Sequence, residues 1–313
     1  GLDMSRRILI GIVAACLLTA CVSTGDAQTV EAKYPPIGSF IEVEGLNIHY
    51  IDEGSGPAVI LIHGANSNLR DWKFALVDKL TAKHRVIAFD RPGLGYSDRP
   101  ASGGDIPAEQ ARILKAAADK LGVGKAVILG HSFGGAVAAA WTVEYPDDVV
   151  GLISLAGATY DWGGSGGALY SIGASSAGGI LGSAARVYVS GDRALGLVND
   201  AFAPNDPIPG YAEYLGVELA LRPETFRYNS TDINRLSGHL AAQSQRYPGI
   251  TQPVVLIHGD ADKTVGLEAH SLRFYDAVEN GRLVVVPGVG HMIHQVSQPR
   301  IIQAIERLAG TAE

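Results

Sequence analysis

Cysteine is almost absent from this sequence. The 313 residues include two, Cys16 and Cys21, and both lie near the N-terminus. The chain that follows Cys21 therefore has no disulfide, no thiolate metal site and no cysteine nucleophile. Any chemistry there has to use other side chains.

A concentrated positive charge is also missing. The formal net charge is -7 at pH 7, the pI is about 5.7, and no long run of Lys or Arg occurs. This argues against a nucleic-acid surface, which needs a concentrated basic footprint. We expect neutral or weakly charged small molecules as substrates. With 47% hydrophobic and 18% charged residues, the chain has the composition of a globular protein.

The apolar run near the N-terminus is too short to span a membrane comfortably. Residues 8–20 follow Arg6 and Arg7 and are typical of the core of a signal peptide. The run ends in Leu-Thr-Ala-Cys at Cys21. This ending resembles the lipobox of bacterial lipoproteins, in which the cysteine becomes the lipidated first residue of the mature chain.

We therefore predict a signal peptide over residues 1–20, followed by a lipidated Cys21 and a short polar tether over residues 21–37. The resemblance implies an exported bacterial lipoprotein that the lipid anchors in a bilayer. The outer membrane is the expected location, facing the periplasm or the cell exterior. Two alternatives stay open: lipidation at Cys16, and an ordinary secretory signal cut after Ala27. Each of them exports the protein.

From residue 38 onward the pattern alternates between strands and helices. The Glu44-Gly45 turn predicts an opening antiparallel hairpin. Continuous apolar runs predict further strands that are buried on both faces. The predicted strands span residues 40–43, 46–51, 58–62, 86–89, 126–129, 149–155, 254–257 and 283–286. The predicted helices span residues 69–80, 107–121, 136–144, 267–278 and 299–308. This alternation predicts an α/β fold in which helices wrap a mostly parallel sheet.

One long stretch interrupts the alternation. Residues 159–245 contain no clear run for a buried strand, and residues 163–185 are rich in Gly, Ala and Ser. We predict a mainly helical cap here, over the carboxyl edge of the sheet. The cap would divide the core into residues 38–158 and 246–313. A floppy surface insertion is the alternative interpretation.

The pattern Gly-x-Ser-x-Gly occurs twice, around Ser132 and around Ser165. Its reactive form needs a strand before the serine and a helix after it, because a strained turn lifts the hydroxyl above the sheet edge. Ser132 lies between the predicted strand 126–129 and the predicted helix 136–144. Ser165 has neither neighbour. We therefore predict Ser132 as a nucleophile.

A serine nucleophile needs a base, and the base needs a group that orients it. Asp260 and Asp262 follow the seventh predicted strand, and His291 follows the eighth. Two successive strands thus end in an acid and a histidine, in the chain order Ser, Asp, His. His294 lies three residues beyond His291 and is the less favoured base.

These residues give the chain a resemblance to the α/β-hydrolase family from Gly38 onward. The motifs that carry it are His63-Gly64, the Asp-Arg-Pro-Gly-Leu-Gly-Tyr-Ser segment 90–97, the Gly-Asp-Ala-Asp turn 259–262 and Gly290-His291. The resemblance implies an eight-stranded, mostly parallel sheet flanked by helices, with the cap inserted after the sixth strand. It also implies that Asp262 is the triad acid, while Asp260 caps the turn.

The resemblance further implies an oxyanion hole made of the backbone N–H groups of Ala65 and Phe133. Asn66 is the alternative second donor. The segment 90–97 is expected to be a structural turn that buttresses the site. His131 precedes the nucleophile on the elbow, so we expect its side chain to point away from the pocket and to pack.

This triad predicts acyl transfer to water. His291 would take the proton from Ser132 as the hydroxyl attacks a carbonyl, and Asp262 would hold the imidazole and steady its positive charge. The mechanism needs no metal and no organic cofactor. A serine at this position excludes the Asp-based alkyl-ester chemistry of the similar epoxide hydrolases and haloalkane dehalogenases.

Hydrolysis of small carboxylic esters or lactones is the leading hypothesis. The His63-Gly64-Ala65-Asn66 loop lacks the Gly-Pro-Gly typical of the meta-cleavage C–C hydrolases. Cofactor-free perhydrolysis or haloperoxidase-type activity on the same triad is an alternative. A ligand-binding protein without turnover is another, because fold alone does not imply catalysis. The intact triad argues against that last possibility.

Overall fold

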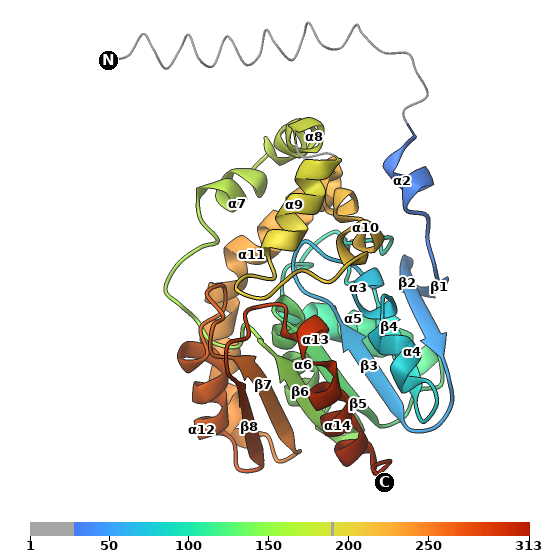
Figure 1. The fold of residues 1–313 in the computed structure, drawn as a ribbon, viewed down its shortest axis with the longest axis vertical. Helices are drawn as coiled ribbons and strands as arrows, with labels where there is room; N and C mark the ends of the chain where they lie inside the picture. The colour runs from blue at the N-terminus through green and yellow to red at the C-terminus, as the bar shows by residue number, and fades with distance from the viewer. Residues whose placement is uncertain (1–27, 189–190) are drawn as a thin grey trace, which may run out of the picture. The chain divides into compact units, whose positions relative to one another are not determined.

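The computed structural model describes residues 28–188 and 191–313 (Figure 1). The chain divides into a short N-terminal unit, residues 1–35, and a large unit, residues 36–313. Within the described ranges, no helix is both long and apolar enough to cross a bilayer.

In the N-terminal unit the structure describes the short helix α2 (Val30–Lys33). Thr29 caps it, because its hydroxyl oxygen accepts a backbone N–H of the first turn at 3.1 Å. The predicted signal peptide and Cys21 lie outside the described residues, so export and lipid anchoring stay predictions. The same holds for the alternatives at Cys16 and Ala27.

The large unit is built on a sheet of eight strands, which confirms the predicted fold class (Figure 1). The strands are β1 (Ser39–Val43), β2 (Leu46–Glu53), β3 (Ala58–Ile62), β4 (Arg85–Phe89), β5 (Ala126–His131), β6 (Val149–Leu155), β7 (Val254–Gly259) and β8 (Gly281–Val286). Their order in the sheet is β1-β2-β4-β3-β5-β6-β7-β8. The opening hairpin and the β2–β4 pair are antiparallel, and β3 to β8 run parallel to one another.

Successive residues of the central strands are buried on opposite faces of the sheet. In β3, Ile60 and Ile62 join the apolar cluster beneath α5 and α6, whereas Val59 and Leu61 join the cluster on the other face. The flanking helices are α5 (Pro107–Lys120), α6 (Phe133–Glu144), α3 (Arg70–Lys73), α4 (Leu76–Leu80), α13 (Ile293–Val296) and α14 (Gln298–Ala309). Burial on both faces explains why these strands are continuous apolar runs in the sequence.

The prediction of one helix over residues 69–80 is wrong, because the structure divides it into α3 and α4. Ala75 lies between them with φ -148° and ψ -43°, outside the helical region. The two helices bury different contacts: the Phe74 ring at the end of α3 packs edge-on against Tyr211 at 5.3 Å, and α4 packs against β4. A contact with a residue so distant in sequence leaves no local pattern.

Between β6 and β7 the chain forms the cap, and its position after the sixth strand confirms the prediction. The cap helices are α7 (Ala168–Gly173), α8 (Gly178–Tyr188), α9 (Asp192–Asp200), α10 (Tyr211–Leu215) and α11 (Pro223–Gln243). They gather at one end of the sheet, at the top of the view in Figure 1. Phe202, Tyr211 and Leu215 of this segment bury their side chains in one cluster with Met292 of the core.

The predicted helix over residues 267–278 begins as a π-helix, η5 (Glu268–Leu272), and continues as α12 (Arg273–Ala277). His270 of the π-helix is buried. Its Nδ1 accepts the backbone N–H groups of Thr159 at 3.0 Å and Tyr160 at 3.2 Å, at the start of the cap segment. Burial, together with neighbouring positive charge, lowers the pKa of His270 to about 4.

We predict that His270 makes the protein less stable as the pH falls from about 6.5 to about 4. In this window the unfolded chain, with an ordinary histidine pKa of about 6.5, binds more protons than the folded chain does. Between pH 7 and pH 5 this difference removes about 2 kcal/mol of unfolding free energy. His270→Asn keeps an acceptor for the two N–H groups but does not titrate. Urea unfolding should therefore show a drop smaller by that amount in the variant, and equal drops in both proteins would contradict the prediction.

Candidate active site

Ser132 lies on a strained turn between β5 and α6. Its φ of 53° and ψ of -117° are rare for any residue with a side chain. The turn is possible because glycines flank the serine at close contacts. A Cβ on Gly130 would lie 2.0 Å from the carbonyl oxygen of Gly134, and one on Gly134 would lie 2.1 Å from the carbonyl oxygen of Ile62. The Gly-x-Ser-x-Gly spacing around Ser132 is thus required by packing.

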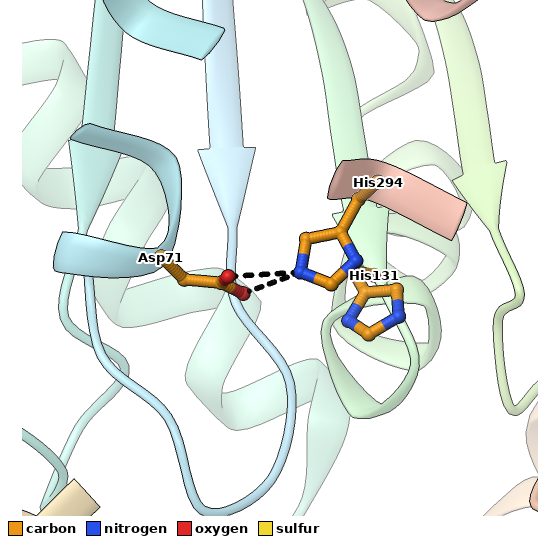
Figure 2. Close-up of side chains that lie close together, drawn as sticks. All are labelled: Asp71, His131 and His294. Carbon is orange, nitrogen blue, oxygen red and sulfur yellow. Dashed lines mark hydrogen bonds and ion pairs between the residues drawn. The ribbon is translucent and has the colours of Figure 1, made fainter. Parts of the chain in front are cut away.

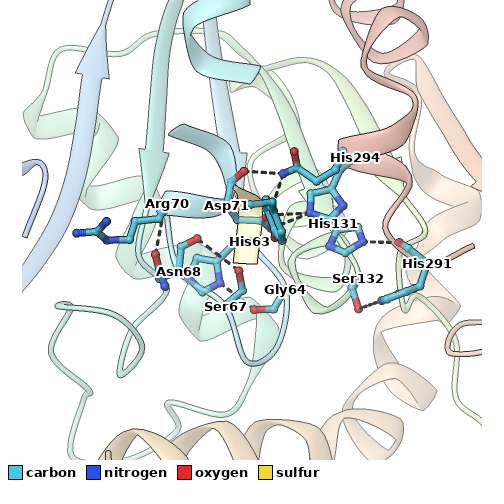
Figure 3. A network of polar contacts seen from close by, with 12 residues as sticks. His63, Gly64, Ser67, Asn68, Arg70, Asp71, His131, Ser132, His291 and His294 are labelled. Carbon is cyan, nitrogen blue, oxygen red and sulfur yellow. Dashed lines mark hydrogen bonds and ion pairs between the residues drawn. The ribbon is translucent and has the colours of Figure 1, made fainter. Parts of the chain in front are cut away.

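The structure brings Ser132, Asp262 and His291 into one chain of hydrogen bonds. Figure 3 shows the link between Ser132 and His291. The Oγ of Ser132 lies 3.0 Å from Nε2 of His291, and Nδ1 of His291 lies 2.8 Å from Oδ2 of Asp262. The first distance allows proton transfer from the serine to the imidazole, and the second allows the carboxylate to orient the ring. Ser165, by contrast, lies in an exposed loop of the cap, where its Oγ accepts the N–H of Gly167 at 3.3 Å.

The carboxylate of Asp262 is held by its own loop. Its Oδ1 accepts the backbone N–H groups of Thr264 and Val265, each at 2.9 Å. Burial alone would raise the pKa of Asp262, but hydrogen bonds from His258 and His291 hold it well below its usual range. The group is therefore an anion at neutral pH. Asp260 is exposed, and its Oδ1 accepts the N–H of Gly288 at 2.7 Å, so it caps the neighbouring turn.

The loop after β3 lies directly against the nucleophile turn. A Cβ on Gly64 would lie 3.1 Å from Cβ of Ser132. Phe133 is the first residue of α6, so its N–H has no acceptor inside the helix. Ala65 follows Gly64 in the loop. The two predicted oxyanion donors thus belong to the two segments that meet at Ser132.

Asn66, the alternative donor, is hydrogen-bonded to the cap. Its backbone N–H donates to Oδ1 of Asn229 at 2.8 Å, and its Oδ1 accepts from Nδ2 of Asn229 at 2.7 Å. Asn229 lies on α11 and is fully buried. Asn66 has a φ of 57°, a left-handed conformation that asparagine tolerates better than most residues. The cap therefore holds the residue next to Ala65 through a reciprocal pair of hydrogen bonds.

Arg91 ties the same loop to α11 from the other side. It donates from Nε to the carbonyl oxygen of His63 at 3.0 Å and from Nη2 to that of Gly64 at 3.2 Å. Its Nη1 donates to Asp232 at 2.9 Å, and both side chains are fully buried. The guanidinium also covers the ring of Phe133, at 4.1 Å from the centroid. One buried cation thus contacts both segments that carry the predicted oxyanion donors.

Asp90, at the start of segment 90–97, holds the backbone at Leu69, which follows the loop after β3, and at Tyr96. Its two oxygens accept the backbone N–H groups of Leu69 at 2.7 Å and Tyr96 at 2.8 Å. His49 of β2 adds a side-chain hydrogen bond at 2.7 Å. Burial alone would raise the pKa of Asp90, but His49 holds it low. Segment 90–97 thus forms a turn that Asp90 ties by hydrogen bonds to Leu69 and to β2.

Asn229 and Asp232 were not predicted from the sequence. Both are polar residues on the buried face of α11, three positions apart, and both are fully buried. Residues at this spacing share one side of a helix. A buried polar residue needs a partner. Such a pair on the apolar side of a predicted helix is the signal that could have marked this face as a contact with the site.

A second group of titratable side chains lies behind the nucleophile turn, formed by Asp71, His131 and His294 (Figure 2). Each of the three residues offers one atom that could bind a metal ion, a ring nitrogen or a carboxylate oxygen, and these atoms lie within 4.8 Å of one another. The rings of His131 and His294 are stacked, however, with centroids 3.6 Å apart and planes at 23°. A metal ion binds in the plane of an imidazole, so rings stacked in this way cannot share one. Asp71 and His294 are instead joined directly by hydrogen bonds, with distances of 2.8 and 2.9 Å.

Comparison with known proteins gives the same fold. A family model described as the alpha/beta hydrolase fold matches residues 57–297. The solved structure of an esterase from Rhodococcus sp. ECU1013 has a TM-score of 0.68 and 25% identity, and the match covers 88% of this chain and 98% of that one. An alpha/beta hydrolase fold protein from Burkholderia ambifaria has a TM-score of 0.70 at 20% identity, covering 85% and 96% of the two chains.

The sequence is also similar to curated proteins over part of its length. A 2-hydroxy-6-oxononadienedioate/2-hydroxy-6-oxononatrienedioate hydrolase of Escherichia coli strain K12 is 38% identical over 118 residues, which is 36% of this chain and 41% of that protein. The chain thus spans about two fifths of the length of these curated relatives. The similarity does not reach far enough to transfer their substrate.

We predict that Asn229→Ala lowers the unfolding free energy by about 1–3 kcal/mol, because it leaves the N–H and the side-chain oxygen of Asn66 without their partner. Urea unfolding at pH 7 measures the change. Arg227→Ala, on the exposed side of the same helix, is the control and should stay within about 0.5 kcal/mol of the parent. Equal effects of the two substitutions would show that the Asn66–Asn229 contact does not stabilise the fold.

Proposed function

This chain is a member of the α/β-hydrolase fold family, and on that premise we propose that it is a serine hydrolase of small carboxylic esters or lactones. The observation that carries the proposal is the chain of hydrogen bonds from Ser132 through His291 to Asp262. A serine hydroxyl is a weak nucleophile until a base takes its proton. Here the base is in place, and an anion orients it.

In the proposed reaction, the Oγ of Ser132 attacks the substrate carbonyl carbon while Nε2 of His291 takes the hydroxyl proton. Asp262 accepts a hydrogen bond from Nδ1 of His291, which keeps Nε2 free to act and stabilises the imidazolium that forms. His291 then gives its proton to the leaving alcohol. Water attacks the acyl-enzyme with the help of the same base, which releases the acid and restores Ser132.

The negative oxygen of the tetrahedral intermediate would accept hydrogen bonds from the backbone N–H groups of Phe133 and Ala65. Such a donor is typically worth about 3 kcal/mol of barrier. The contacts of Arg91 and Asn229 hold the Ala65 loop in place before substrate arrives. A donor that is already oriented costs no reorganisation during the reaction.

Two comparisons within the family favour ester or lactone substrates. An Asp nucleophile forms an alkyl ester with its substrate, whereas Ser132 forms an acyl-enzyme, so haloalkane and epoxide chemistry does not fit. The E. coli relative is named as a 2-hydroxy-6-oxononadienedioate/2-hydroxy-6-oxononatrienedioate hydrolase. This chain departs from the C–C hydrolases in the loop 63–66, which lacks their Gly-Pro-Gly. The serine nucleophile and this loop together support a carboxylic ester or lactone as the substrate.

We predict that Ser132→Ala abolishes release of p-nitrophenol from short and medium acyl esters, because it removes the attacking oxygen. Asp262→Asn should lower kcat by about 10³–10⁴-fold, since the amide favours the wrong histidine tautomer. Asp260→Asn is the matched control and should keep kcat within a few-fold, because the amide oxygen can still accept the N–H of Gly288. Activity that survives Ser132→Ala would contradict the proposal.

A substrate panel and a covalent probe together test the whole proposal. We expect a fluorophosphonate probe to label the parent protein at Ser132, because such probes react fast with an activated serine, and not to label Ser132→Ala. The panel should hold esters of graded chain length, lactones, a 2-hydroxy-6-oxo-dienoate, and acetate with peroxide. Labelling without ester or lactone turnover would overturn the substrate assignment, and absence of labelling would overturn the enzyme assignment.

A further inference from the structure

The side chain of His131 reaches the loop that carries the base (Figure 3). Its Nε2 lies 2.9 Å from the backbone carbonyl oxygen of His291. A carbonyl oxygen only accepts hydrogen bonds, so Nε2 of His131 carries a proton and donates it. Burial, with His294 and His291 nearby, keeps the pKa of His131 well below its usual value. The ring is therefore neutral, with Nε2 as its donor.

A buried hydrogen-bonded pair, Asp71 and His294, lies next to this ring (Figure 2). Nε2 of His294 donates to the two oxygens of Asp71 at 2.9 and 2.8 Å. Asp71 also accepts the amide of Gln295 at 3.0 Å and the hydroxyl of Tyr211. Burial alone would raise the pKa of Asp71, but His294 holds it well below its usual range. Donors from the core and from the cap thus fix the direction of this carboxylate.

The His294 ring, oriented by Asp71, sets the plane of the His131 ring. The two rings stack at 3.6 Å, and Trp72 packs edge-on against His294 at 5.5 Å. Nδ1 of His294 is buried and has no hydrogen-bond partner among the described residues. The hydrogen bonds to Asp71 are therefore what orients the His294 ring.

We propose that His131 is a positioning residue for the base, and that the Asp71–His294 pair holds His131 in the orientation that this role needs. The inference rests on the proposed function, because the base it positions is the one assigned there. His291 follows β8 and precedes α13, so only a loop and a short helix carry it. His131 attaches the backbone of that loop to the end of β5, and His294 attaches α13 to α3.

The two attachments hold His291 at the distance from Ser132 that proton transfer requires, 3.0 Å between Oγ and Nε2. A displacement of about 1 Å at reacting groups can cost about 10²-fold in rate. A loop that drifts would lower kcat, whereas substrate affinity would change little, because His131 itself touches no substrate in this scheme. The role therefore predicts a loss confined to kcat.

The experiment compares two substitutions that separate the donor from the ring. His131→Phe keeps a flat ring to stack on His294 but has no donor. His131→Gln lacks the ring but can place an amide N–H near the carbonyl oxygen of His291. His84→Phe is the matched control, because His84 is buried and hydrogen-bonds the carbonyl oxygen of Leu80 at 3.0 Å, far from the site in the fold. Thermal unfolding accompanies every kinetic measurement.

We expect His131→Phe to lower kcat for p-nitrophenyl esters by about 10–100-fold with KM within about twofold. His131→Gln should recover most of kcat, and His84→Phe should keep the parent value. If His131→Phe fails to fold, His131→Asn replaces it, since its shorter amide does not reach the carbonyl. A parent-like kcat in the donor-less variant, or equal losses in the Phe and Gln variants that follow their melting temperatures, would overturn the proposal.

A second readout needs no substrate and separates this proposal from the proposed function. The Nδ1 proton of His291, hydrogen-bonded to Asp262, should give a low-field proton resonance in the parent and in His131→Gln. We expect this resonance to shift or broaden beyond detection in His131→Phe. If the parent shows no Ser132-dependent turnover, the proposed function fails, and the resonance alone then decides whether His131 positions the loop. An unchanged resonance in His131→Phe would count against it.

Discussion

The site depends on parallel strand pairing in register. Strands β3 to β8 all end at the same edge of the sheet, so the residues that follow them are brought together whatever their distance in sequence. His63 follows β3, Ser132 follows β5, and the loops with Asp262 and His291 follow β7 and β8. Because Ile62 at the end of β3 pairs with Gly130 of β5, the loop after β3 lies directly against the turn that carries Ser132.

This constraint explains which parts of the site could be predicted from the sequence. Ser132, Asp262 and His291 each come soon after an apolar run, and the buried parallel strands that produce such runs also fix where their ends lie. The cap was predicted from the lack of such runs. Its helices were not located individually, because α7 and most of α8 lie in the stretch 163–185, whose many Gly, Ala and Ser residues mark no helix boundaries.

The parts that could not be predicted depend on contacts between distant residues. Asn66 and Asn229 are 163 residues apart, and Arg91 and Asp232 are 141 apart. In each pair, no sequence motif contains both residues, so the sequence around one of them gives no indication of the other. The break between α3 and α4 has the same origin, since Phe74 packs against Tyr211 of the cap. Local pattern fixes the strands and the order of the reactive groups, whereas tertiary contacts fix the orientation of the loops.

Two buried pairs of polar side chains join the cap and the α13 segment to the core. Arg91 with Asp232 is fully buried, and Asp71 with His294 is nearly so. The ion pair of Arg91 with Asp232 contributes little net stability, because removing both charges from water offsets most of their attraction, but removing one partner costs about 3–5 kcal/mol. The Asp71–His294 hydrogen bonds act in the same direction, because a buried polar group that loses its partner is destabilising. A shift of the cap or of the α13 segment that separated the partners of a pair would therefore be strongly destabilising.

The reciprocal contact between Asn66 and Asn229 limits how this family member can diversify. A cap inserted between two strands is a module whose replacement would change the substrate range without touching the reactive groups. Here, however, a transplanted cap would also have to supply an amide and an acid three residues apart on the helix that returns to the core. Recombination that ignores this requirement would exchange the cap and, in the same event, loosen the loop that carries the proposed oxyanion donor Ala65.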